Sequence, residues 1–122
     1  MPRAAPPTIA VTLGDPNGIG PEVALRALHS SGLPAGVRWV LVGAPSLAAA
    51  AARLYDFSSP LEWDGPAARP PRARVSVWMP PEAPPAPPRR PGRLEARAAA
   101  AAAAWVRAAA RGCLDGRFDG MV

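Results

Sequence analysis

The sequence is short of the residues from which disulfide frameworks and metal centres are built. Its 122 residues include a single cysteine, Cys113, and a single histidine, His29. One cysteine cannot form a disulfide within the chain, and zinc sites usually take three or four Cys, His or carboxylate ligands. These absences indicate a reducing compartment and argue against a catalytic metal site built from this chain alone. We therefore expect His29 to have a local structural role.

Long hydrophobic runs are also missing. The apolar run Ile9–Leu13 is too short for the core of a secretory signal. The stretch Ala98–Val106 is too short to span a bilayer, and Arg97 and Arg107 close it on both sides. The sequence therefore predicts a soluble, cytoplasmic protein with no membrane partner.

Lysine is absent, so all 14 basic residues are arginine, and with 9 acidic residues the net charge is +5. A strongly basic chain is often a nucleic-acid-binding protein. Here the arginines are scattered, only Arg89 and Arg90 are adjacent, and no aromatic residues interleave with them as a stacking surface requires. Together with the heavy use of alanine and proline, this pattern indicates a GC-rich coding bias. We expect no nucleic-acid partner.

The first 55 residues alternate between strand and helix patterns. Thr8–Leu13 and Val37–Val42 are mostly apolar runs typical of buried strands. Each is followed by a predicted helix, Pro21–Ser30 and Leu47–Tyr55, the second with Ser46 as its N-cap. Strand and helix alternating in this way predict a parallel α/β sheet.

A Pro/Arg-rich loop at about 57–92 interrupts this regularity. Arg74–Trp78 is its one candidate strand, and Pro80–Pro91 is expected to be an extended, polyproline-like connection. Two interpretations of Pro84–Arg89 remain open. It has the composition of a ligand for SH3-type domains, and it also fits an expanded surface loop, which the coding bias favours.

A long helix is predicted over Arg93–Leu114, because alanine is the best helix former. An alanine face buries little area per residue, so we expect Trp105, Val106 and Leu114 to anchor this helix to the core. Phe118–Val122 then has the pattern of a third core strand.

No covering layer follows that last strand, although parallel sheets are normally buried on both faces. We therefore expect residues 1–122 to be the N-terminal fragment of a single, incomplete α/β domain. The expected order of elements is strand, helix, strand and helix, followed by the Pro-rich connection, the Ala-rich helix and the start of a further strand.

The glycine loop, residues 14–20, is the feature with chemical content. Its spacing, G-x-x-x-G-x-G, matches neither the dinucleotide fingerprint nor the P-loop. Gly18 and Gly20 would let a ligand approach the backbone, and the helix that starts at Pro21 directs its positive end at the loop. An anionic or nucleotide group fits such a loop. A tight turn that merely needs glycine at positive φ fits it equally well.

The run Thr12–Glu22 resembles the N-terminal signature of the 4-hydroxythreonine-4-phosphate dehydrogenase family, G-D-P-x-G-I-G-P-E after the first strand. The inserted Pro16-Asn17 separates it from the shorter signature of isopropylmalate and isocitrate dehydrogenases. Gly92-Arg93-Leu94, the Ala-rich helix and Ala110–Val122 resemble the elements that in the family lead into a T-[AG]-P-x-x-K segment. The resemblance covers most of this chain but only the first third of a family member.

The resemblance implies an isopropylmalate-dehydrogenase-like fold and a homodimer with its active site in a cleft. It also implies NAD as hydride acceptor and a divalent metal, zinc, magnesium or cobalt, held by histidines of both subunits. The implied reaction oxidises the alcohol of 4-phosphooxy-L-threonine to a ketone and then releases the carboxylate as carbon dioxide. That reaction is a step in pyridoxal phosphate biosynthesis.

The resemblance assigns five loop residues to the cleft near substrate or nicotinamide: Gly14, Asp15, Gly18, Ile19 and Gly20. Glu22 is expected to be a helix-start residue. The family's metal histidines, its substrate-contacting His-Thr pair and its lysine all lie beyond Val122, and His29 matches none of them. We therefore expect no catalytic or metal residue in this chain, and no activity from the isolated chain.

Three alternatives stay open. Related dehydrogenases acting on 4-phospho-threonate or 4-phospho-erythronate share the signature. A non-catalytic remnant would keep the fold without the chemistry. A small basic binding module would act through the Pro/Arg-rich segment.

Overall fold

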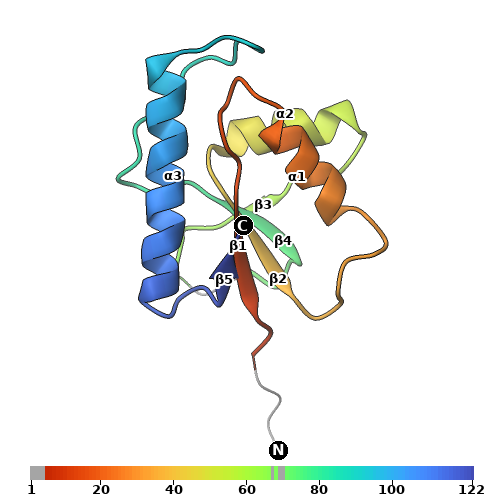
Figure 1. Ribbon diagram of the computed structural model, residues 1–122. Coiled ribbons are helices and arrows are strands. Elements are labelled where there is room, and N and C mark those ends of the chain that lie inside the picture. The colour runs from red at the N-terminus through yellow and green to blue at the C-terminus, as the bar shows by residue number, and fades with distance from the viewer. Residues whose placement is uncertain (1–4, 67, 69–70) are drawn as a thin grey trace, which may run out of the picture.

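The computed structural model describes residues 5–66, 68 and 71–122 and contains a five-stranded parallel sheet (Figure 1). The strands are β1 (Thr8–Thr12), β2 (Arg38–Val42), β3 (Leu61–Glu62), β4 (Val75–Trp78) and β5 (Gly120–Met121). Their order in the sheet is β3-β4-β2-β1-β5, and each neighbouring pair is parallel. The predicted parallel α/β fold is confirmed.

Helices cover both faces of the sheet. α1 (Gly20–Leu28) and α2 (Pro45–Leu54) pack together on one face, and α3 (Ala96–Leu114) lies on the opposite face (Figure 1). The chain first moves outward from β1 through β2 to β3 at the edge, steps back to β4 between β3 and β2, and then passes through α3 to place β5 on the other side of β1. Crossovers between parallel strands are right-handed, so this reversal of direction puts α3 on the opposite face.

α3 approaches the sheet closely because its buried face consists mostly of small residues. Every third or fourth residue is buried, namely Ala98, Ala101, Ala104, Trp105, Ala108, Ala109 and Gly112. A Cβ on Gly112 would lie only 2.5 Å from the Phe118 ring. Phe118 itself is 2% exposed and packs with Trp63 and Trp78 in an aromatic cluster.

Two of the three predicted anchors of α3 are wrong. Trp105 is fully buried, as predicted, but Val106 is 44% exposed and Leu114 is 87% exposed. At 3.6 residues per turn, neither lies on the stripe that contains Trp105 and Gly112. Phe118, which follows the helix, supplies the missing apolar contact.

The predicted N-cap of the second helix is also wrong. α2 begins at Pro45, its N-cap is Ala44, and no side chain caps it by a hydrogen bond. Proline fits the first turn because its absent N–H would have no partner there. Ser46 therefore lies inside the helix.

The sheet edges differ from the prediction as well. β3 was not predicted: it has only two residues, both exposed, so no pattern of alternating burial marks it. The candidate strand at Arg74–Trp78 is confirmed as Val75–Trp78. The strand predicted as a third core strand, β5, lies at the outer edge of the described sheet.

Among the described helices, none combines the length and apolarity required to cross a membrane.

Candidate functional site

The glycine loop connects the carboxyl end of β1 to the start of α1. β1 pairs with β2 on one side and β5 on the other, so the chain direction across the sheet reverses at this strand. In parallel α/β sheets, ligands bind outside the carboxyl ends of the strands at such a reversal. The fold therefore places the loop where sheets of this class bind ligands.

The three glycines named as site residues meet different structural demands. Gly14 has φ of +75°, the left-handed region that favours glycine. At Gly20 an added Cβ would collide with the carbonyl oxygen of Leu13, so this glycine allows the chain to pack against itself. At Gly18 the backbone is not in the left-handed region, and an added Cβ would be 3.4 Å from the Asp15 carbonyl oxygen, an ordinary contact. A tight turn thus explains Gly14 and Gly20 but not Gly18.

Asp15 shapes the loop through a local hydrogen bond. Its Oδ1 accepts from the backbone N–H of Asn17 at 2.8 Å, and its carbonyl oxygen accepts from Gly18 N–H at 2.9 Å. An aspartate that bonds its own backbone two residues on is typical of a tight turn. The side chain is partly exposed, and its Oδ2 has no partner among the described residues.

The beginning of α1 offers free hydrogen-bond donors. The N-cap Ile19 makes no side-chain cap, and the backbone N–H groups of Ile19, Gly20 and Glu22 have no partner among the described residues. Such donors, together with the helix dipole, attract anionic groups. The Ile19 side chain is 69% exposed beside them. The loop can therefore accept an anionic group through its backbone, next to an exposed apolar side chain.

Arg89, from the Pro/Arg-rich segment, lies against this loop. Its Nε donates to the Pro16 carbonyl oxygen at 3.2 Å, and its Nη2 donates to Glu22 Oε1 at 2.6 Å and to the Gly18 carbonyl oxygen at 3.5 Å. Glu22 is thus paired as well as placed at the helix start. The Pro80–Pro91 segment contains no helix or strand, begins with a turn at residues 80–83 and runs along the surface, and Arg89 fastens its far end to the loop.

Asn17 connects the loop to the same segment. It is 4% exposed, and its Oδ1 accepts from Arg90 N–H at 2.7 Å. Its Nδ2 donates to the Arg93 carbonyl oxygen at 3.1 Å and to Glu95 Oε1 at 3.3 Å. Its own carbonyl oxygen accepts from Gly92 N–H at 2.9 Å. Sequence reasoning missed Asn17 and Arg89, because contacts over more than 70 residues leave no local pattern.

His29 has a local environment, as expected. Its Nδ1 is 2.8 Å from the Leu25 carbonyl oxygen one turn earlier in α1, and its ring stacks on Phe57 at 3.9 Å. Within the described part of the chain, no three His, Cys, Asp or Glu side chains gather as a metal site requires. The described residues therefore do not fit the metal that the sequence resemblance implies.

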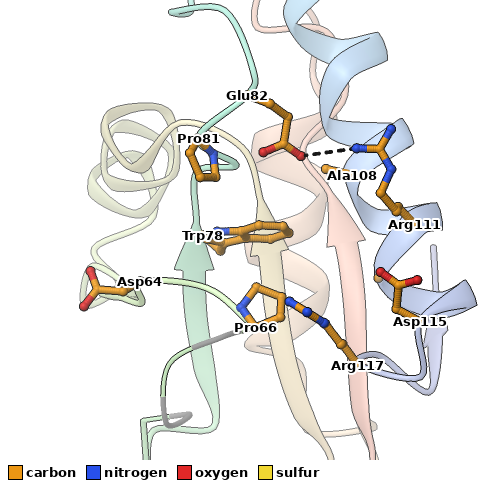
Figure 2. Close-up of a pocket in the computed structure, with 10 residues that line it drawn as sticks. Asp64, Pro66, Trp78, Pro81, Glu82, Ala108, Arg111, Asp115 and Arg117 are labelled. Carbon is orange, nitrogen blue, oxygen red and sulfur yellow. Dashed lines mark ion pairs between the residues drawn. The ribbon is translucent and has the colours of Figure 1, made fainter.

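Several hollows lie on the surface of the described residues. A groove of about 310 Å³ next to the loop is lined by Pro16, the start of α2 and residues 86–89. A second, of about 230 Å³, lies between α3 and the segments after β3 and β4 (Figure 2). Figure 2 shows Trp78 within it and Glu82 pointing toward Arg111, 3.8 Å away. None of the five predicted site residues lines either hollow, but Pro16 of the glycine loop lines the first.

Comparison with known proteins gives structural matches only. No protein-family model matches the chain, and no curated protein matches it significantly. A 4-hydroxythreonine-4-phosphate dehydrogenase from Burkholderia phymatum superposes with a TM-score of 0.76 at 20% identity over 94% of this chain. The same enzyme from Klebsiella pneumoniae superposes with a TM-score of 0.70 at 29% identity over 92% of this chain.

The chain spans only about 35% of the length of each of these two proteins. Both carry the name of the family whose signature the glycine loop resembles. The resemblance to the N-terminal portion of 4-hydroxythreonine-4-phosphate dehydrogenases, predicted from the loop motif, is therefore confirmed by the fold of nearly the whole chain.

Proposed function

We propose that this chain forms the N-terminal part of an NAD- and divalent-metal-dependent dehydrogenase that acts on 4-phosphooxy-L-threonine. The proposed reaction transfers a hydride from the substrate carbinol carbon to NAD and a proton to a base, which leaves a ketone. Loss of the adjacent carboxylate as carbon dioxide follows. The proposed setting is pyridoxal phosphate biosynthesis in the cytoplasm, and the proposed assembly is a homodimer.

The observation that carries the proposal is Gly18. Neither its backbone angle nor its neighbours require a glycine, yet it lies in a loop at the chain reversal of the sheet, in a fold shared with named dehydrogenases. A glycine that the fold itself does not require supports a role in letting a ligand approach the backbone. We propose that Gly14, Asp15, Gly18, Ile19 and Gly20 line the cleft.

Within this proposal the loop binds and orients and does not transfer protons. The N–H groups of Ile19, Gly20 and Glu22 would hold an anionic part of NAD or substrate, and NAD supplies the hydride acceptor. Among the described residues no three His, Cys, Asp or Glu side chains gather as a metal site requires, so no metal-dependent step is assigned to them. The domain assignment follows: residues 1–122 are proposed to be part of one α/β domain that is completed by further chain.

A chimeric enzyme tests the proposal. This chain replaces the matched N-terminal segment of the Klebsiella pneumoniae enzyme, and NADH formation is measured with 4-phosphooxy-L-threonine, 4-phospho-threonate and 4-phospho-erythronate. We expect metal-dependent NADH formation, greatest with 4-phosphooxy-L-threonine. Preference for either of the other two substrates would move the assignment to that related activity.

Gly18→Ala in the chimera separates ligand binding from folding. We expect kcat/KM to fall about tenfold or more, because small displacements of a bound substrate are costly, while the circular dichroism spectrum stays unchanged. A folded chimera with no activity on any of the three substrates would refute the proposed function.

The isolated 122-residue chain is expected to form no NADH, because its described residues contain no metal site. Purified chain is assayed with 4-phosphooxy-L-threonine, NAD and each of zinc, magnesium and cobalt. Metal-dependent NADH formation above a no-protein control would overturn this expectation.

A further inference from the structure

The connection between β4 and α3 is fastened to the glycine loop at its far end. Arg89, Arg90, Gly92, Arg93 and Glu95 each contribute an atom to a contact with the loop or with the start of α1. Backbone and side-chain atoms both take part. We call this set of contacts between residues 89–95 and residues 16–22 the clasp.

Asn17 lies at the centre of the clasp. Its amide uses Oδ1 as an acceptor and Nδ2 as a donor to two partners, and the side chain is buried. Its partners are Arg90 N–H and the Arg93 carbonyl oxygen, and the amide of the buried Asn17 would be costly to leave unpaired. An aspartate here would keep the acceptor but lose both donors, and would place a carboxylate beside Glu95.

The clasp acts on the part of the loop that faces the proposed ligand. Asn17 N–H is held by Asp15, and the carbonyl oxygens of Pro16 and Gly18, on either side of Asn17, accept from Arg89. The fixed carbonyl of Gly18 sets the orientation of the peptide unit that carries the N–H of Ile19. The N–H of Ile19, at the start of α1, is therefore oriented by a contact with Arg89, which is 71 positions from Gly18.

We infer that Asn17 is a positioning residue: it fastens segment Arg89–Glu95 to the glycine loop and so orients the free backbone donors at the start of α1. The part that concerns the ligand rests on the proposed function. The clasp also engages Arg89 at Glu22 and the loop, so the arginine of the Pro84–Arg89 motif has partners within this chain.

The test is a compensating pair of substitutions in the full chain. In Asn17→Asp two carboxylates face each other, whereas in Asn17→Asp with Glu95→Gln the new amide donates to the new carboxylate. Amide hydrogen exchange at Arg90 and Gly92 is measured without ligand, with Val40 and Leu41 in the buried strand β2 as internal references. Ser59→Ala, at an exposed position, is the matched control.

We expect Asn17→Asp to accelerate exchange at Gly92 about tenfold or more while Val40 stays unchanged, because clasp opening is local. The double variant restores the contact at position 95 but not the bond to the Arg93 carbonyl oxygen, so its exchange is expected to lie between those of Asn17→Asp and the wild type. If Asn17→Asp fails to fold, Glu95→Ala, which removes one acceptor, is expected to give a smaller acceleration at the same amides. Unchanged exchange in either single variant, equal acceleration at Val40, or absence of rescue would overturn the inference.

The same variants in the chimera test positioning. Asn17→Asp is expected to lower kcat/KM about tenfold or more, and the double variant is expected to recover it. Because exchange is measured without ligand, an inactive chimera with an intact clasp refutes the proposed function alone. An active chimera whose kcat/KM is unchanged by Asn17→Asp refutes the positioning role alone.

Discussion

Gly18 and Gly20 are two positions apart, and the fold restricts them very differently. The Cα of Gly20 faces the carbonyl oxygen of Leu13, a backbone atom of the preceding strand end that cannot rotate away. A Cβ added to Gly18 would meet its neighbours at an ordinary contact distance, and the backbone at Gly18 is in a region that other residues also adopt. Stability and ligand binding can therefore be separated by substitutions within one short loop.

Gly20→Ala is expected to destabilise the chain by about 2 kcal/mol or more, because the new methyl group forces the loop away from Leu13. Gly18→Ala is expected to change the free energy of unfolding by no more than about 0.5 kcal/mol. Urea unfolding followed by tryptophan fluorescence measures both. Equal effects of the two substitutions would contradict the roles assigned to these glycines.

At the scale of elements, α3 depends on small side chains where it meets the sheet. Ala101 is completely buried, with 0% of its surface exposed, whereas Ala103 is exposed on the outer face of the same helix. A leucine at either position suits a helix equally well. Only the buried position has no room for the three extra carbons.

Ala101→Leu is therefore expected to cost about 1–3 kcal/mol through overpacking. Ala103→Leu, the matched control, is expected to be nearly neutral. Thermal unfolding by circular dichroism measures both, and a neutral Ala101→Leu would show that the contact between helix and sheet is loose.

The elements that could be predicted are those with local signals. Apolar β-branched runs marked β1 and β2, Pro21 marked the start of α1, and the alanine run marked α3. What failed depended on tertiary context: the exposure of Val106 and Leu114 follows from helix phase, which a uniform alanine sequence does not reveal. The loop motif identified the candidate site, but the clasp joins residues whose proximity only the fold determines.

At the scale of the whole molecule, the sheet has an open edge at β5. Within the described residues, β5 pairs only with β1, and its Met121 and the following Val122 are 36% and 76% exposed. An unpaired strand edge with apolar side chains promotes pairing with other chains. We therefore expect the isolated chain to be poorly soluble.

Met121→Lys is expected to reduce this self-association, because a charge on an edge strand disfavours edge-to-edge pairing. Light scattering after size-exclusion chromatography measures the mass as a function of concentration, and Leu94→Lys, a charge at a 99% exposed position away from the edge, is the control. A monomeric wild-type chain at all concentrations would contradict the prediction.

The pairing of β1 with β5 also has a consequence for the order of folding. Thr8 meets Arg38 of β2 across 30 residues but meets Asp119 beside β5 across 111. Loop-closure entropy grows with the logarithm of loop length, so the second pairing costs about 1 kcal/mol more to nucleate. During synthesis the β1-α1-β2 unit can close while β5 has yet to leave the ribosome. The strand that flanks the glycine loop on its far side is therefore expected to join after β2, so that the loop passes through a stage with only one of these two neighbours in place.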